Sequence, residues 1–229
     1  MNYKNVLTFF AHPDDETLAA GGTINKLVRE GCRVSVAIPN TGIFSRRNSQ
    51  TENDLSGALV VLREDCLKAL SLLGVKKEDI YLGSFSDNEI DKHTLLELIH
   101  WFEVVLEKVK PDAIFTHHRY CTNIDHRYCH EAAVVATRPG IDSHIPLFCG
   151  EVPSSTGYLK PVQWEPNFYV DLTEDDVEKK ISSMQAFKGE ARPNPHPRSP
   201  EVLRALAKVR GSESGYYFAE AFMIIKMFA

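Results

Sequence analysis

The sequence predicts a single α/β domain whose mainly parallel sheet is covered by helices on both faces. Two observations support this fold class. The chain has 229 residues, a length typical of one compact domain. Along it, short apolar segments rich in β-forming residues alternate with longer segments of helical periodicity. This alternation is typical of parallel sheets, because the helix that joins two parallel strands covers one face of the sheet. We therefore expect residues 1–229 to form one domain.

The alternation begins at the amino terminus. Residues 5–10 form a short apolar run, and apolar side chains recur at helical spacing in residues 17–30. The same pattern then predicts a strand at 33–38 and a long helix at 52–73, which Gly74 ends. The first half of the chain therefore contains two strand-and-helix units.

The remaining elements continue the pattern with less regularity. The expected elements are strands at 79–82 and 112–116, helices at 94–109 and 125–137, strands at 146–149 and 167–172, a helix from Thr173, and a helix at 199–210. Four prolines mark 191–200 as an irregular loop. The apolar residues 215–227 fit no element firmly.

Composition limits the classes of partner and compartment. The 26 Lys and Arg residues against 31 Asp and Glu give a net charge of −5, which argues against nucleic acid or an anionic membrane as the main partner. The first apolar run is too short for a signal peptide or membrane span. Five cysteines without a CxxC pair predict reduced thiols, hence a cytoplasmic protein. Aromatic residues near the carboxyl end, such as Phe222 and Phe228, are compatible with a homo-oligomer.

The strongest chemical feature follows the first predicted strand, and its members are His12, Asp14, Asp15 and Glu16. In parallel α/β sheets the ligand crevice lies beyond the carboxyl ends of the strands. Three carboxylates packed so closely repel one another, and a divalent cation would offset that cost. The same residues are also suited to cap the following helix. This segment alone therefore does not distinguish a metal site from a helix cap.

A second polar cluster follows the strand at 112–116, and its members are His117, His118, Asn123, Asp125 and His126. Catalytic zinc takes three protein ligands from histidine and carboxylate and leaves a position for water. His12, one of Asp14 or Asp15, and His126 supply that set. The alternative for this cluster is a row of surface histidines at a loop and helix start.

Two motifs carry a family resemblance: Ala-His-Pro-Asp-Asp-Glu at 11–16 and Asp-His-Arg at 125–127. Together they resemble the GlcNAc-PI de-N-acetylase family, the PIG-L-like or LmbE-like deacetylases, and weaker matches such as Phe-Ala-Glu-Ala-Phe at 218–222 extend along most of the chain. The resemblance implies a Rossmann-like three-layer fold and one catalytic zinc ion or another divalent metal. It also implies hydrolysis of an N-acetyl group from an amino sugar, such as N-acetylglucosamine, or a similar amide.

The resemblance also implies a role for each residue of the first motif. His12, Asp15 and His126 correspond to the zinc ligands, and Asp14 corresponds to the general base. This division is chemically sound, because a carboxylate held off the metal can accept the proton of an activated water. Glu16 is the weaker candidate for the base and is expected to cap or orient the loop.

Asn123 departs from the family pattern, in which many members carry a histidine that stabilises the oxyanion. An amide donates a hydrogen bond without charge, and losing one oxyanion donor costs on the order of 100- to 1000-fold in rate. His117, His118 and His196 are the candidates for the missing cation. Asp125 either caps the following helix or hydrogen-bonds a metal ligand, and we favour the second role.

The substrate is expected to contact Arg63 and Asp87, where the resemblance places residues that hold sugar hydroxyls, together with Asn123 and His196. His130 shares a helix face with His126, a spacing seen in two-histidine metal sites, but the ligand set is complete without it and we expect it to be packed. Two other functions stay open. We expect a zinc-dependent deacetylase of amino sugars; the alternatives are a zinc amidohydrolase for another N-acyl amine or conjugate and a non-catalytic module that binds a sugar or nucleotide.

Overall fold

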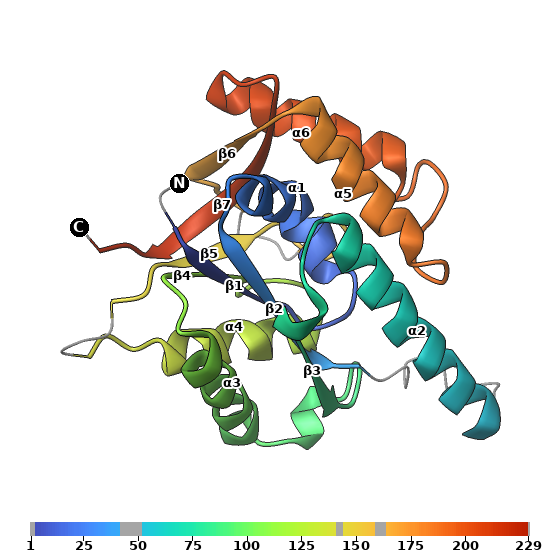
Figure 1. The fold of residues 1–229 in the computed structure, drawn as a ribbon, viewed down its shortest axis with the longest axis vertical. Helices are drawn as coiled ribbons and strands as arrows, with labels where there is room; N and C mark the ends of the chain where they lie inside the picture. The colour runs from blue at the N-terminus through green and yellow to red at the C-terminus, as the bar shows by residue number, and fades with distance from the viewer. Residues whose placement is uncertain (1–2, 42–51, 141–143, 159–163, 229) are drawn as a thin grey trace.

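The computed structural model describes residues 3–41, 52–140, 144–158 and 164–228, and it confirms the predicted α/β fold class (Figure 1). The strands are β1 (Asn5–Phe9), β2 (Arg33–Asn40), β3 (Ile80–Phe85), β4 (Ala113–His117), β5 (Leu147–Gly150), β6 (Phe168–Leu172) and β7 (Phe218–Lys226). The α-helices are α1 (Asp15–Arg29), α2 (Glu52–Leu72), α3 (Leu95–Val109), α4 (Ile124–Ala136), α5 (Glu174–Ala186) and α6 (Pro200–Ser214).

The strand order fixes where a ligand can bind. The seven strands form one sheet in the order β3-β2-β1-β4-β5-β7-β6. The pairs from β3 to β5 are parallel, whereas β7 runs antiparallel to both β5 and β6. The chain reverses its winding direction between β1 and β4, so the loops that follow these two strands diverge and leave a crevice between them.

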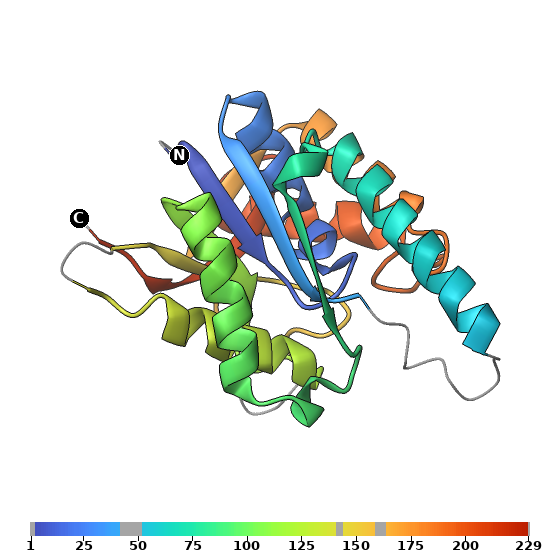
Figure 2. The same ribbon diagram turned by 60° about the horizontal axis from the view of Figure 1, so that its bottom comes forward.

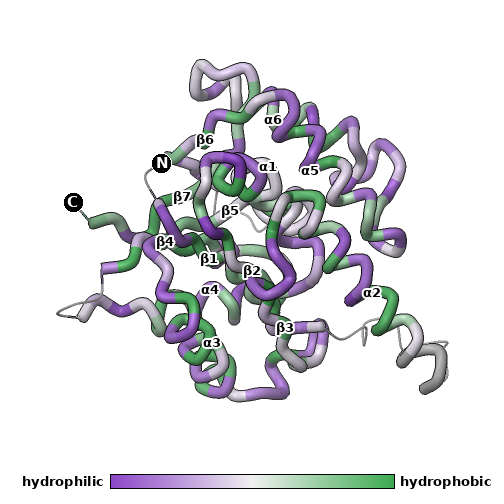
Figure 3. The backbone as a smooth tube through the Cα atoms, in the orientation of Figure 1, coloured by the Kyte–Doolittle hydropathy of each residue, from purple (hydrophilic) through white to green (hydrophobic). Residues whose placement is uncertain are grey.

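Helices cover the sheet on both faces and make three layers (Figure 2). One core cluster joins the sheet to α1, α2, α5 and α6, and a second cluster joins it to α3 and α4. The tube coloured by hydropathy shows apolar residues along the strands and alternating polar and apolar segments along the helices (Figure 3). Amphipathic helices packed on a buried parallel sheet account for this pattern.

The structure corrects the helix-cap alternative for the first motif. Asp14 is the residue directly before α1. Its φ is 117°, and its side chain makes no capping hydrogen bond. The helix also begins at Asp15, two residues before the predicted start. Asn123, and not Asp125, caps α4, because the Asn123 side chain accepts a hydrogen bond from the backbone N–H of Asp125 at 2.8 Å. The carboxylates of both motifs are therefore available for other contacts.

Two further findings bear on the expected environment. The cysteines at positions 32, 66, 121, 129 and 149 are all buried and unpaired. Among the helices in the described part of the chain, none combines the length and the apolar character that crossing a bilayer requires.

Candidate active site

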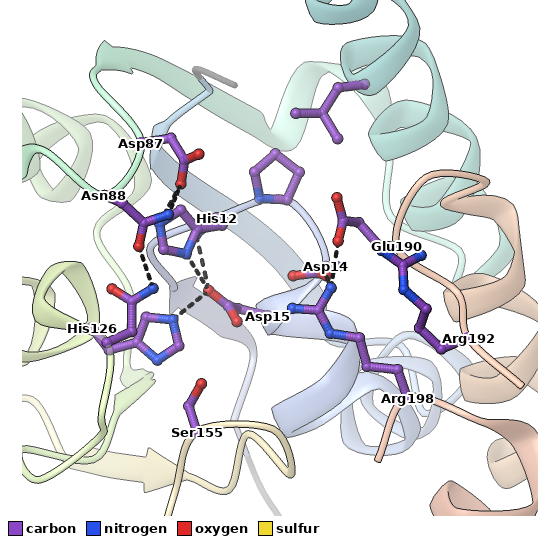
Figure 4. A pocket seen from close by; sticks show the side chains of 13 residues that line it. His12, Asp14, Asp15, Asp87, Asn88, His126, Ser155, Glu190, Arg192 and Arg198 are labelled. Atoms are coloured by element: carbon purple, nitrogen blue, oxygen red, sulfur yellow. Dashed lines mark hydrogen bonds and ion pairs between the residues drawn. The ribbon is translucent and has the colours of Figure 1, made fainter. Parts of the chain in front are cut away.

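The loops at the carboxyl ends of β1, β3 and β4 surround a cavity of about 290 Å³, together with the loop that follows α5 (Figure 4). His12, Asp15 and His126 lie at its centre, and Asp87 and Asn88 lie on one side of it. Glu190, Arg192 and Arg198 lie on the opposite side, beyond Asp14. The cavity occupies the crevice that the strand order creates, and its lining is mainly polar.

Three side chains at the centre of the cavity form a group that can hold a metal ion. Asp15 Oδ2 lies 3.0 Å from His12 Nδ1 and 3.1 Å from His126 Nε2. One potential ligand atom from each residue lies within 4.8 Å of those of the other two. Two imidazole nitrogens and one carboxylate oxygen match the donor set of catalytic zinc sites. These residues therefore fit a divalent ion.

The charges of this group are strongly coupled. Burial alone would raise the pKa of Asp15, but the neighbouring imidazoles, His126 foremost, hold it well below its usual range. Burial lowers the pKa of His12, yet hydrogen bonds to Asp125 and Asp15 raise it well above its usual value. A divalent cation bound here would compete with a proton for His12, because a histidine ligand binds a metal through a deprotonated nitrogen.

Asp125 holds the ring of His12 in place through a hydrogen bond to its Nε2. Its Oδ2 accepts hydrogen bonds from His12 Nε2 at 2.9 Å, Asn40 Nδ2 at 2.6 Å and the backbone N–H of Asn88 at 2.6 Å. Its Oδ1 accepts a bond from the backbone N–H of Ile90 at 3.3 Å. A carboxylate on one imidazole nitrogen leaves the other, Nδ1, free to bind a metal. The role of Asp125 in supporting a metal ligand stays a prediction.

Two other groups in the described residues have similar spacing, but they fit a metal less well. The first is His12, Asp87 and Asp125, in which Asp125 already accepts four hydrogen bonds. The second is His117, Cys121 and His126. There His117 Nε2 lies 2.7 Å from the backbone N–H of Ala11, and burial raises the pKa of the Cys121 thiol to about 12. The lone pair of His117 Nε2 accepts the Ala11 N–H, so that atom is not available to a metal.

Asp14 lies beside the metal group but belongs to none of these sets. Its buried carboxylate faces Arg198, with Oδ2 at 2.9 Å from Nη1. Burial raises the pKa of Asp14 well above its usual range, although the Arg198 charge opposes this shift. A carboxylate with a raised pKa can accept a proton and return it near neutral pH.

Glu16 supports the loop from the inside. It is fully buried, and its carboxylate accepts bonds from the Asp14 backbone N–H at 3.3 Å and from Thr17 Oγ1 at 3.0 Å. Burial raises its pKa to about 7. These contacts orient the loop and do not reach the cavity lining.

The structure separates the predicted substrate residues into two pairs. Asp87 and Asn123 line the cavity, where Asn123 Nδ2 also donates a hydrogen bond to Asn88 Oδ1 at 2.8 Å. Arg63 is exposed on α2, donates a hydrogen bond to Thr41 Oγ1 at 3.3 Å and is not among the lining residues. His196 is exposed and is also absent from the lining. The substrate contacts of all four stay predictions.

None of the three histidines predicted as a source of the missing cation lines the cavity. Burial lowers the pKa of His117 well below its usual value and that of His118 to about 4. Burial and the nearby Arg198 charge also lower the pKa of His196. His130 is buried, with Nδ1 at 2.9 Å from the His117 carbonyl oxygen, which agrees with a packed role. The cation beside Asp14 is Arg198.

Sequence reasoning missed Arg198 and its partner Glu190. Arg198 lies within the proline-rich loop at 191–200 and Glu190 directly precedes it, and in such a loop no periodicity indicates which way a side chain faces. One feature of the sequence places Arg198 next to a fixed point of the backbone. Arg198 directly precedes Ser199, and a serine before a helical run is typical of an N-cap. The structure confirms that Ser199 caps α6.

Comparison with known proteins agrees with the fold and the motifs. The family model described as PIG-L, GlcNAc-PI de-N-acetylase, matches residues 7–137. A diacetylchitobiose deacetylase of Thermococcus kodakarensis is 27% identical over 97% of this chain and 83% of its own. A probable N-acetyl-α-D-glucosaminyl L-malate deacetylase 2 of Bacillus cereus is 30% identical over 49% of this chain and 51% of its own.

A solved structure resembles the whole fold. The N,N'-diacetylchitobiose deacetylase of Pyrococcus horikoshii matches with a TM-score of 0.78 and 23% identity, over 98% of this chain and 85% of its own. The relatives thus include deacetylases of N-acetylated sugars and sugar conjugates, in a family of metal-dependent enzymes. Since the family model spans more than half of its residues, this chain belongs to the GlcNAc-PI de-N-acetylase (PIG-L) family.

Proposed function

We propose that this protein is a zinc-dependent hydrolase that removes an N-acetyl group from an amino sugar or sugar conjugate. One observation carries the proposal. A buried carboxylate, Asp14, lies next to a two-histidine, one-aspartate group in a polar cavity, yet is held outside that group by an ion pair. A hydrolase that activates water needs this separation between metal ligand and base.

Each residue of the chain has a distinct part in the proposed reaction. His12, Asp15 and His126 would hold the zinc ion, which when bound polarises the acetyl carbonyl and acidifies water. Asp125 keeps the ring of His12 in position. Asp14 accepts a proton from the attacking water and returns it to the amine as the amide C–N bond breaks. The products are acetate and the free amino sugar.

The lining of the cavity favours a sugar as the substrate. The Asp87 carboxylate and the Asn88 amide lie on the side away from Arg198, and the Asn123 amide, also in the lining, is hydrogen-bonded to Asn88. Such groups hydrogen-bond hydroxyls. Leu62 and Pro13 are the apolar members of the lining, so an acyl chain much longer than acetyl finds little apolar surface. The activities named for the relatives support the same substrate class.

We also propose a cytoplasmic location, on the basis of the thiols. All five cysteines are buried and unpaired. Unpaired cysteines are typical of proteins in reducing compartments.

Chelation offers a direct test of this function. The metal-loaded protein is incubated with a panel of N-acetyl sugars and of non-sugar N-acyl amines, and mass spectrometry follows the free amine. We expect release from at least one N-acetyl sugar, loss of at least about 100-fold in rate after dialysis against a strong chelator, and recovery on adding Zn²⁺.

Three results would contradict the proposal. Release from the non-sugar amines alone would identify an amidohydrolase of the other class. A rate that chelation leaves unchanged would reject the metal dependence. Tight sugar or nucleotide binding without any hydrolysis by the zinc-loaded protein would identify a binding module.

A further inference from the structure

The orientation of the Asp14 carboxylate depends on one side chain. Among the described residues, Arg198 alone lies within ion-pair distance of it, with Nη1 at 2.9 Å from Oδ2. The backbone of Asp14 has φ 117°, a conformation that residues other than glycine rarely adopt. No capping bond to α1 restrains the side chain. The carboxylate therefore depends on Arg198 for its direction.

Arg198 is itself held in place by a second carboxylate. Its Nη1 lies 2.5 Å from Glu190 Oε2, and Figure 4 shows the guanidinium between Asp14 and Glu190. The segment that carries both residues, 187–199, is fixed at its two ends. Phe187 is fully buried at the end of α5, and Ser199 is fully buried where it caps α6.

Further bonds restrain this segment along its length. The backbone N–H groups of Glu190 and Ala191 each donate to the Phe187 carbonyl at 2.9 Å, and the Lys188 N–H donates to Asp65 Oδ2 at 3.2 Å. The Arg198 N–H donates to His196 Nδ1 at 3.1 Å. The guanidinium is thus presented to Asp14 by a restrained segment of chain.

The position of Asp14 in the chain makes this restraint necessary. Asp14 is adjacent to Asp15, so an unrestrained Asp14 carboxylate is free to turn onto an ion held by Asp15, His12 and His126. It would then occupy the position that water and substrate need, and it would no longer act as a base. The ion pair with Arg198 draws Asp14 Oδ2 toward the opposite side of the cavity from Asp87 and Asn88.

We propose that Arg198, held by Glu190, is a positioning residue that keeps Asp14 off the metal and directed at the attacking water. This inference rests on the proposed function in one respect, which is that Asp14 acts as the base. It assigns to Arg198 no contact with the substrate.

Kinetics of Arg198→Ala test the proposal. We expect kcat to fall about 100-fold with KM changed less than about threefold, because a base displaced by about 1 Å loses this much rate. Added guanidinium ion should restore part of kcat, and Arg198→Lys should fall in between because a single ammonium replaces the planar fork. Arg204→Ala is the matched control: this arginine of α6 pairs with Glu174 at 3.2 Å, outside the cavity lining.

A spectroscopic measurement separates positioning from other roles and needs no turnover. The Co²⁺-loaded proteins are compared by visible absorption, which weakens as the coordination number of Co²⁺ rises. We expect weaker absorption for Arg198→Ala than for wild type, and the wild-type intensity again in Arg198→Ala/Asp14→Asn, since an amide is a poorer ligand than a carboxylate. Thermal melts identify any variant that fails to fold, and Arg198→Lys then takes its place in the comparison.

The outcomes are distinct. A higher KM with unchanged kcat would show that Arg198 binds substrate, and identical Co²⁺ spectra would show that Asp14 stays in place without it; either result overturns the proposal. If wild type hydrolyses no N-acetyl sugar, the proposed function fails, whereas the Co²⁺ spectra still decide whether Arg198 keeps Asp14 off the metal.

Discussion

Replacing Asp14 with asparagine should lower the rate of N-acetyl hydrolysis by about 10²- to 10⁴-fold, the usual contribution of a general base. Asparagine has nearly the same shape and can still accept a hydrogen bond from Arg198, which lies 2.9 Å from Asp14 Oδ2. It cannot accept a proton from water near neutral pH. Asp14 does not belong to the group formed by His12, Asp15 and His126. The metal content of Asp14→Asn should therefore stay at the wild-type level.

Initial rates of amine release, measured by mass spectrometry together with the metal content of the same samples, check this prediction. Asp175→Asn, an exposed carboxylate in the first turn of α5, is the control. A rate for Asp14→Asn within about threefold of wild type would remove Asp14 from the proton transfer. A parallel loss of bound metal in Asp14→Asn would instead identify Asp14 as a metal ligand.

Glu220→Ala should destabilise the protein by about 3–5 kcal/mol, the usual cost of removing one partner from a buried ion pair. Glu220 Oε1 lies 2.6 Å from Lys180 Nζ, and both side chains are buried. The same carboxylate accepts bonds from the backbone N–H groups of Gly22 at 3.0 Å and Thr23 at 2.7 Å in α1. Alanine would leave the Lys180 charge and these donors without their acceptor.

Urea unfolding at neutral pH measures this loss. Glu178→Ala is the matched control, because Glu178 is a half-exposed carboxylate on α5 that pairs with Arg204, and such a pair contributes about 0–1 kcal/mol. A change of less than about 1 kcal/mol for Glu220→Ala would show that Lys180 finds another partner or loses its proton. Since α1 begins at Asp15, we expect Glu220→Ala also to lower metal retention on heating.

The fold was largely predictable because its elements are locally encoded. Apolar runs followed by helical periodicity identified β1 to β6 and all six helices, with boundaries that differ by a few residues. The sequence pattern does not predict β7, which lies between β5 and β6 and is mostly buried at its start. A strand covered on both faces shows no polar alternation, so a strand and a short buried helix could not be distinguished there.

The centre of the site was also accessible from sequence, since strand ends in a parallel sheet meet at one edge. His12, Asp15 and His126 follow β1 and β4, which are neighbours, and the structure brings them together. Arg198 was not accessible in this way. Its contact with Asp14 depends on how an irregular segment folds back over the crevice, and no local pattern of residues encodes that path.

Anomalous diffraction at the zinc edge from crystals grown with Zn²⁺ tests the central claim most directly. We expect one peak per chain, about 2.0–2.2 Å from His12 Nδ1, one Asp15 oxygen and His126 Nε2. Asp14 should remain paired with Arg198, and the ion should have a face open to the cavity. A peak at His117 and Cys121 without contact to Asp15, or an ion enclosed by four protein ligands, would contradict the account.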